Sequence, residues 1–141
     1  MRQRLTLTLM LVVASLTGGV AAAQDGPVYV AYYWRAKPDR VADYNAYIRD
    51  YAEPIDEEAR RGGAFEEVRT YLAAGRTDGQ QPEWTHLRVF EVKNGAAADA
   101  LSAALDAATK KLRNEEQRKA ASEKSAALRD FVRSERWTQL R

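Results

Sequence analysis

Residues 28–37 have the sequence VYVAYYWRAK, and this stretch decides the first element of the fold. It is rich in β-branched and aromatic residues, which are typical of strands. Alternation along a strand predicts two opposite sets of side chains: Val28, Val30, Tyr32, Trp34 and Ala36 on one face, and Tyr29, Ala31, Tyr33 and Arg35 on the other. Because both faces carry large apolar groups, we expect this strand to be covered on both sides.

A helix is predicted directly after this strand, opened by Pro38 and Asp39. Its apolar residues recur every three or four positions, at Val41, Tyr44, Ile48, Tyr51, Ile55 and Ala59. Pro54 lies inside this run, where a proline removes one backbone donor and costs about 3 kcal/mol. The periodicity continues in phase past Pro54, so we predict one kinked helix that ends at Gly62 and Gly63.

The rest of the chain alternates between strand and helix patterns. Strands are predicted over 64–72 and 84–92, with a loop over 73–83 between them, and a last strand over 131–140. Asn94 is a candidate cap for a helix with an apolar stripe formed by Leu101, Leu105, Ala108 and Leu112. Residues 113–125 are polar nearly all round, which fits either a solvated helix extension or a mobile loop.

The predicted order β-α-β-β-α-β is the ferredoxin-like arrangement, an α+β fold with an antiparallel sheet and helices on one face. The other face carries too many large side chains to lie in water. We therefore expect a second subunit to cover it.

Four short segments carry a resemblance to a known superfamily: YWRAKP at 33–38, EPI at 53–55, RGG at 61–63 and VRSERW at 132–137. Through them the chain resembles the dimeric α/β-barrel superfamily over nearly all of 28–140, and within it the small exported proteins of unknown function. The resemblance implies a homodimer in which two sheets face each other. It implies no activity, because that subgroup brings none with it.

Other members of the superfamily are cofactor-independent quinol monooxygenases, haem-degrading monooxygenases and stress-responsive barrel proteins. Their sites lie in the cavity between sheet and helices. Function varies widely on this one scaffold, so the resemblance alone does not select an activity.

The first 23 residues have the pattern of a secretory signal peptide. Arg2 and Arg4 precede an apolar run over 5–20, which is followed by the small-residue triplet Ala21–Ala22–Ala23. Cleavage there leaves a single domain over 24–141, and a bacterial protein that is periplasmic or secreted, with no stable membrane anchor. The alternative is an uncleaved anchor, since the run approaches the minimum of about 17 residues needed to span a bilayer.

Charge and composition exclude several function classes. The net charge of +2 comes from 22 basic and 20 acidic residues, and Arg2 and Arg4 leave with the predicted signal peptide. The remaining domain is electrically balanced, which argues against a nucleic-acid partner. The chain has no cysteine, and therefore no disulfide, thiol nucleophile or lipid-modified cysteine. It also lacks a phosphate-binding loop, a dinucleotide fingerprint and a nucleophile elbow. We predict no cofactor.

An acidic series on the predicted helix suggests a metal site at first sight: Asp50, Glu53, Asp56, Glu57 and Glu58. With one distant histidine and no cysteine, a tight transition-metal site lacks ligands. Glu57 and Asp56 each have an arginine four residues on, Arg61 and Arg60, which is the favourable helix pairing. We therefore interpret the series as solvated helix charge and predict no metal.

His86 is the only histidine and the candidate catalytic residue, because its ordinary pKa lies near neutrality. It would act as a general base or a haem ligand. Haem-degrading relatives carry their histidine in a helix, whereas His86 lies in a predicted strand. The alternative is a hydrogen-bonded histidine at a subunit interface or strand end.

Two groups of side chains are candidates for binding a small molecule. The first is expected to point away from the helices and comprises Tyr33, Arg35, Arg69, Tyr71, His86, Arg88 and Glu135; its arginines and tyrosines, with Trp84, are the candidate ligand-binding residues. Such a set suits a polar or anionic molecule, or equally a network that joins two subunits. The second group is aromatic, and forms either a pocket for a flat ligand or ordinary core: Tyr32, Trp34, Tyr44, Tyr47 and Tyr51.

Three functions follow as hypotheses. The first is a dimeric barrel that binds a small molecule in the sheet–helix or inter-subunit cavity. The second is a cofactor-independent monooxygenase acting on an aromatic or quinol, with His86 or a tyrosine as proton acceptor. The third is a structural partner protein that uses residues 113–125 as its contact surface.

Overall fold

The computed structural model describes residues 26–140, and the predicted signal peptide lies outside them. Nine elements follow one another along the chain: β1 (Val28–Ala36), α1 (Val41–Tyr47), the π-helix η1 (Ile48–Ala52), α2 (Glu53–Arg61), β2 (Glu67–Leu72), β3 (His86–Val92), α3 (Gly95–Leu112), α4 (Glu115–Leu128) and β4 (Arg129–Thr138). None of the described helices is long and apolar enough to cross a membrane.

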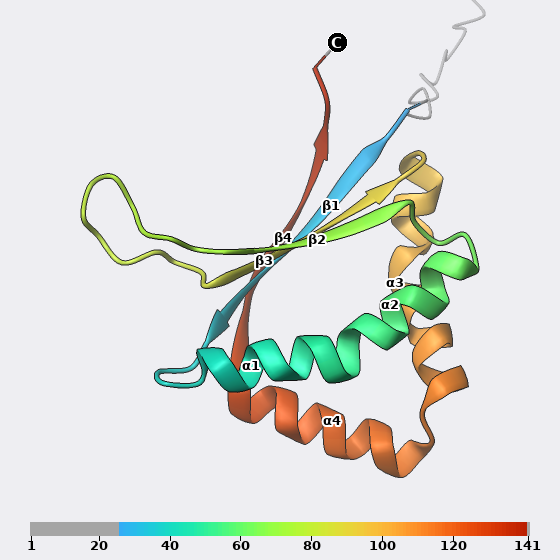
Figure 1. Ribbon diagram of the computed structural model, residues 1–141. Coiled ribbons are helices and arrows are strands. Elements are labelled where there is room, and N and C mark those ends of the chain that lie inside the picture. The colour runs from blue at the N-terminus through green and yellow to red at the C-terminus, as the bar shows by residue number, and fades with distance from the viewer. Residues whose placement is uncertain (1–25, 141) are drawn as a thin grey trace, which may run out of the picture.

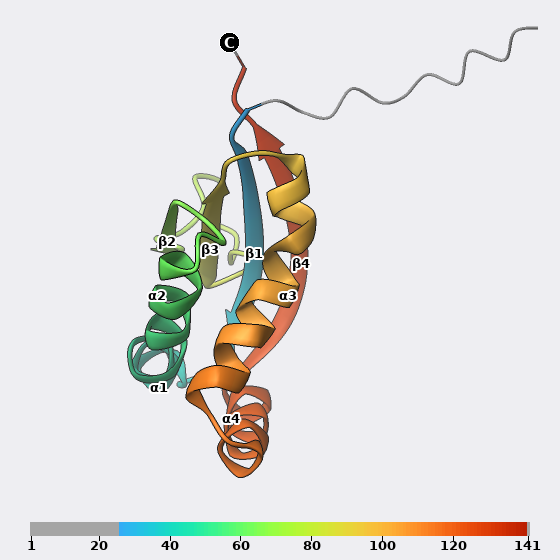
Figure 2. The same cartoon turned by 90° about the vertical axis from the view of Figure 1, so that its right-hand side faces the viewer.

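The four strands form one antiparallel sheet in the order β2-β3-β1-β4. Figures 1 and 2 show the helices gathered on one face of this sheet. This order and the helix placement are those of the ferredoxin-like fold, so the predicted α+β class is confirmed. The side chains of β1 point to the two faces of the sheet as the alternation predicted, and Val28 and Val30 pack in the core beneath the helices.

The predicted kinked helix is confirmed as the unit α1–η1–α2. At its centre the backbone N–H of Glu53 donates to the carbonyl of Ile48, five residues back, which is the π-helical pattern. The widened turn ends just before Pro54, which lies in the first turn of α2, where its missing donor is tolerated. The N–H of Gly62 closes the helix on the carbonyl of Glu58.

Most of residues 113–125 is helical and exposed, as one of the two predicted alternatives had it, but these residues belong to a separate helix and do not extend the preceding one. Arg113 is extended and ends α3, and Asn114 then caps α4 through a reciprocal capping box with Gln117. Ala121 and Leu128 of α4 are buried against the first helical unit. The apolar side of α4 is too short and too alanine-rich to stand out in the sequence.

The side chains of β3 divide differently from the expected arrangement. His86, Arg88 and Phe90 are buried on the helix side of the sheet, whereas His86 and Arg88 were predicted to point away from the helices. The pairing of β1 with β3 explains this, because Phe90 lies opposite Val30 and His86 lies opposite Trp34. Phe90 belongs to the core, and residues two and four positions away on a strand share its face.

The start of β2 also differs from the prediction. The strand begins at Glu67 and not at residue 64, and Phe65, two residues before it, is buried in the core. The Phe65 and Phe90 rings meet edge to face with centroids 5.0 Å apart. Because residue 65 precedes the strand, its side chain does not have to follow the alternation of faces along β2.

Candidate functional site

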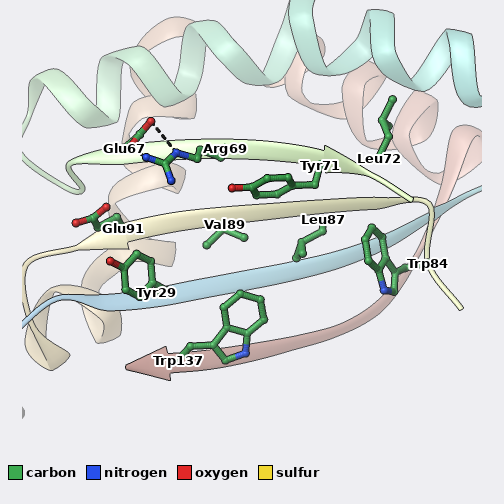
Figure 3. A pocket seen from close by; sticks show the side chains of 10 residues that line it. All are labelled: Tyr29, Glu67, Arg69, Tyr71, Leu72, Trp84, Leu87, Val89, Glu91 and Trp137. Atoms are coloured by element: carbon green, nitrogen blue, oxygen red, sulfur yellow. Dashed lines mark hydrogen bonds and ion pairs between the residues drawn. The ribbon is translucent and has the colours of Figure 1, made fainter. Parts of the chain in front are cut away.

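The face of the sheet that carries no helix has a shallow groove of about 520 Å³ (Figure 3). Its lining comes from all four strands and the loop before β3: Tyr29, Glu67, Arg69, Tyr71, Leu72, Trp84, Leu87, Val89, Glu91 and Trp137. Three of the predicted ligand-binding residues, Arg69, Tyr71 and Trp84, line this groove. Tyr33 lies beside it, with its ring centroid 5.7 Å from that of Trp84. Arg35 points elsewhere and donates to the carbonyl of Glu83 at 2.7 Å.

The charges on this outer face are largely neutralised within the chain. Arg69 forms two hydrogen bonds with Glu67, the shorter of them 2.6 Å. Arg133 pairs with Glu135 at 2.7 Å, and Glu135 also accepts from the Tyr33 hydroxyl at 3.0 Å. These hydrogen bonds hold the pKa of Glu135 below its usual range. The arginines here are therefore poorly available to an anion, and the apolar centre of the groove suits a protein surface.

A second cavity of about 290 Å³ lies between the sheet and the helices, and we call it the inner cavity. Its lining is contributed by β1, the first helical unit, β3, α3 and the start of β4: Tyr32, Trp34, Tyr47, Tyr51, Ala52, Ile55, Asp56, Arg88, Phe90, Ser102, Leu105 and Arg129. Four of the five aromatic residues predicted to be pocket or core line it. The fifth, Tyr44, is fully buried beside it.

Arg129 places a positive charge at the aromatic wall of the inner cavity. Its guanidinium carbon lies 3.6 Å from the ring centroid of Trp34, which is a cation–π contact. Nη1 donates to the hydroxyl of Tyr44 at 2.6 Å, and Nε donates to the hydroxyl of Ser125 at 2.9 Å. No carboxylate of the described residues lies within 4.0 Å of this guanidinium. Burial raises the pKa of Tyr44, and the charge of Arg129 opposes that rise.

Asp56 and Arg88 form a buried ion pair in another part of the same wall. Their side chains are only 7% and 10% exposed, and Arg88 Nη2 donates to Asp56 Oδ2. Arg88 Nε also donates to the hydroxyl of Thr70 at 3.2 Å. Burial raises the pKa of Asp56, and the guanidinium of Arg88 opposes the rise.

The interpretation of Asp56 as solvated helix charge is therefore wrong. Its expected partner four residues on, Arg60, pairs instead with Glu57 at 3.0 Å. The remaining prediction for the acidic series holds for Glu57, which is exposed and also lies 4.0 Å from Arg61. Asp56 differs because its position in α2 faces Arg88 across the core rather than solvent.

His86 lies in the core and lines none of the cavities found in the described residues. Its Nδ1 lies 2.8 Å from the Thr85 hydroxyl, which itself accepts from the backbone N–H of Ala36 at 2.7 Å. Its Nε2 lies 2.9 Å from Asn45 Oδ1. This arrangement fits a neutral ring that accepts at Nδ1 and donates from Nε2.

The electrostatics of His86 agree with that protonation state. Burial, and after it the charge of Arg129, lower the pKa of His86 to about 4. The ring also packs against Tyr44, with centroids 4.3 Å apart. Because the ring is buried, hydrogen-bonded at both nitrogens and absent from the cavity linings of the described residues, we assign it no catalytic step.

Comparison with known proteins yields structural likenesses only. No family model matches the chain, and no curated protein sequence matches it. Three similar solved structures are an ethyl tert-butyl ether degradation (EthD) family protein from Bacillus halodurans, HapK from Hahella chejuensis, and a dimeric protein of unknown function and ferredoxin-like fold from Bacteroides fragilis.

The likenesses extend over most of each chain at low identity. The Bacillus protein has a TM-score of 0.48 at 9% identity, covering 82% of this chain and 99% of its own. HapK has a TM-score of 0.45 at 13% identity, covering 80% and 92%. The Bacteroides protein has a TM-score of 0.47 at 12% identity, covering 82% and 97%. The assignment to the ferredoxin-like fold rests on the strand order and register of this chain.

Proposed function

We propose that this protein binds a small, flat, anionic molecule in the inner cavity. The observation that carries the proposal is Arg129, a guanidinium that lines an aromatic cavity without a carboxylate partner among the described residues. An anionic group on a ligand would supply that partner, because guanidinium and carboxylate form strong charge-assisted hydrogen bonds.

The shape and lining of the inner cavity narrow the ligand further. Ligand sites usually have volumes from about 300 Å³ upward, so a cavity of about 290 Å³ suits a compound with a single ring. Tyr47 and Tyr51 stack with centroids 5.2 Å apart and present ring surfaces to this space. Aromatic walls favour a flat aromatic ligand through offset or edge-to-face contacts.

Binding is better supported than oxygenation. A monooxygenase of the kind considered above requires a proton acceptor beside its substrate, and His86 does not line the cavity. The sequence offered His86 or a tyrosine as the proton acceptor, and of these only tyrosines line the cavity. We therefore propose a binding role first.

We propose further that two copies pair through the outer face of the sheet. Tyr29, Leu87, Val89 and Trp137 form an apolar centre flanked by the internally paired charges of Glu67 and Arg69. An apolar patch with a polar rim is the usual composition of a subunit interface. Light scattering at micromolar concentration tests this, and a stable monomer would contradict it.

Export remains a proposal that rests on residues 1–23. Expression of the full chain in a bacterium, followed by fractionation and mass measurement, provides the test. A periplasmic or secreted product that begins at Gln24 is expected. A product that retains its N-terminus in the cytoplasm would refute both the cleavage and the location.

Calorimetric titration with benzoate and its neutral amide, benzamide, tests the proposed anion site. We expect benzoate to bind at least tenfold more tightly, a difference of about 1.4 kcal/mol. Arg129→Gln should abolish this preference, and Arg129→Lys should retain part of it. Arg136→Gln is the matched control, because Arg136 lies on the same strand but is exposed and pairs with Asp99.

Two outcomes would contradict the proposal. One is equal affinity of the unaltered protein for the acid and the amide, or no binding of either. The other is an unchanged preference in Arg129→Gln. Circular dichroism of each variant establishes that it is folded, and the preference is a ratio within one variant, so a general loss of stability does not imitate the expected result.

A further inference from the structure

The ion pair of Asp56 and Arg88 retains hydrogen-bonding capacity on the wall of the inner cavity. Asp56 uses only Oδ2 in its bond to Arg88, and Arg88 uses only Nε and Nη2. Asp56 Oδ1 and Arg88 Nη1 have no hydrogen-bond partner among the described residues. Both side chains are buried, yet no fully buried side-chain nitrogen or oxygen of the described residues lacks a partner. These two atoms therefore reach open space.

Two spaces border the pair. Asp56 and Arg88 line the inner cavity, and they also line an open groove of about 730 Å³ between α2 and β2. The pair thus forms part of the wall that separates the two. A ligand in the inner cavity contacts this wall, whereas Arg129 lies at a different part of the lining, at the start of β4.

The unused atoms of the pair are one acceptor, Asp56 Oδ1, and one donor, Arg88 Nη1, and this combination favours a particular group on a ligand. A hydroxyl donates one hydrogen bond and accepts others, so it can satisfy Asp56 Oδ1 and Arg88 Nη1 together. A second carboxylate on the ligand would be repelled by the negative charge of Asp56. An ammonium group would be repelled by the positive charge of Arg88. Burial also raises the pKa of Asp56, which makes its carboxylate a stronger acceptor.

We propose that the ligand of the inner cavity is a hydroxylated aromatic acid, whose acid group pairs with Arg129 and whose hydroxyl bonds to the Asp56–Arg88 pair. This inference rests on the proposed function and adds the second recognition group. Asp56 and Arg88 then act as specificity residues. A ligand without the hydroxyl fills the cavity but leaves two desolvated polar atoms without partners, which is how buried polar sites reject such analogues.

The test compares 3- and 4-hydroxybenzoate with 3- and 4-fluorobenzoate, which have similar size but no hydroxyl donor. In the unaltered protein we expect one hydroxy acid to bind at least tenfold more tightly than its fluoro counterpart. The double variant Asp56→Leu with Arg88→Met should lose this hydroxyl advantage while it still binds benzoate. Replacing both members avoids an unpaired buried charge. Glu57→Gln, one residue further along α2 and exposed, is the matched control and should keep the advantage.

The outcomes separate this inference from the proposed function. If benzoate binds but the hydroxyl gives no advantage, or if the advantage survives in the double variant, the role of the pair is overturned and the anion site stands. If none of the acids binds, both fail. If the double variant does not fold, a structure of the unaltered protein bound to the tighter hydroxy acid tests the inference in its place. A hydroxyl oxygen beyond hydrogen-bond distance of Asp56 Oδ1 then overturns the inference.

Discussion

Acidification should destabilise this protein through His86, in a range where ordinary carboxylates scarcely titrate. The folded protein holds the pKa of His86 at about 4, against 6.5 for an unperturbed histidine. Between these values the unfolded chain binds more protons than the folded one, so stability is present above pH 6.5 and is lost as the pH falls toward 4. Linkage gives a loss of about 2 kcal/mol between pH 7 and pH 5, and about 3 kcal/mol by pH 4.

Urea unfolding of the unaltered protein and of His86→Gln, at several pH values from 7 to 5, isolates this effect. The variant does not titrate at this position, and the carboxylates are common to both proteins. The difference in unfolding free energy between the two should therefore shrink by about 2 kcal/mol as the pH falls to 5. A difference that stays constant within about 0.5 kcal/mol over this range would refute the account of His86 as a buried neutral ring.

Three further outcomes are expected. Asn114→Ala removes the side-chain cap of α4 and should lower the unfolding free energy by about 1 kcal/mol in urea; an unchanged midpoint would mean that the capping box is not formed. Tyr44→Phe removes the hydroxyl that accepts from Arg129 and should cost about 1 kcal/mol, with a stability equal to that of the unaltered protein as the contrary result. Val89→Lys places a charge in the apolar centre of the outer face and should shift the proposed dimer to monomer in light scattering without loss of helix signal; an unchanged mass would exclude that face.

The sheet and the kinked helix could be predicted from the sequence because each has a strong local pattern. The alternation of residues 28–37 assigned the two faces of β1, and the apolar spacing carried the helix through Pro54. The faces of β3 could not be assigned in the same way. Alternation within a strand defines two sets of side chains, and only pairing with another strand shows which set meets the helices.

One clue to the correct face of β3 was present in the sequence. Phe90 lies on the same face of the strand as His86 and Arg88, and Val92, two residues further on, shares that face, which makes Phe90 a good core candidate. The polar character of His86 and Arg88 instead favoured placing this face of the strand away from the helices. The structure reconciles them by giving each polar group a partner from a helix, Asn45 for His86 and Asp56 for Arg88.

The inner cavity was only half visible in the sequence. Its aromatic lining was recognised as a set, because aromatic residues at strand and helix spacing share a face. Of its charged members, the sequence indicates only Arg88 as a binding residue, and it assigns Arg88 to the opposite face of the sheet. Asp56 and Arg88 are 32 residues apart, and Arg129 lies between the polar segment 113–125 and the strand predicted over 131–140. A contact that depends on two elements meeting in space leaves no periodic trace in either of them.

The two arginines of the inner cavity differ in a way that bears on function. Arg88 is buried and neutralised by Asp56, which is how folded proteins usually accommodate such a charge. Arg129 is partly buried, and stacking on Trp34 with two hydrogen bonds to hydroxyls takes the place of a carboxylate. Cation–π stacking contributes from about 0.5 kcal/mol at exposed sites to about 2 kcal/mol at desolvated ones, which offsets only part of the cost of desolvating a cation. A neutral side chain could hold Tyr44 and Ser125 at lower cost, and the proposed anionic ligand would give this positive charge the anionic partner that it lacks among the described residues.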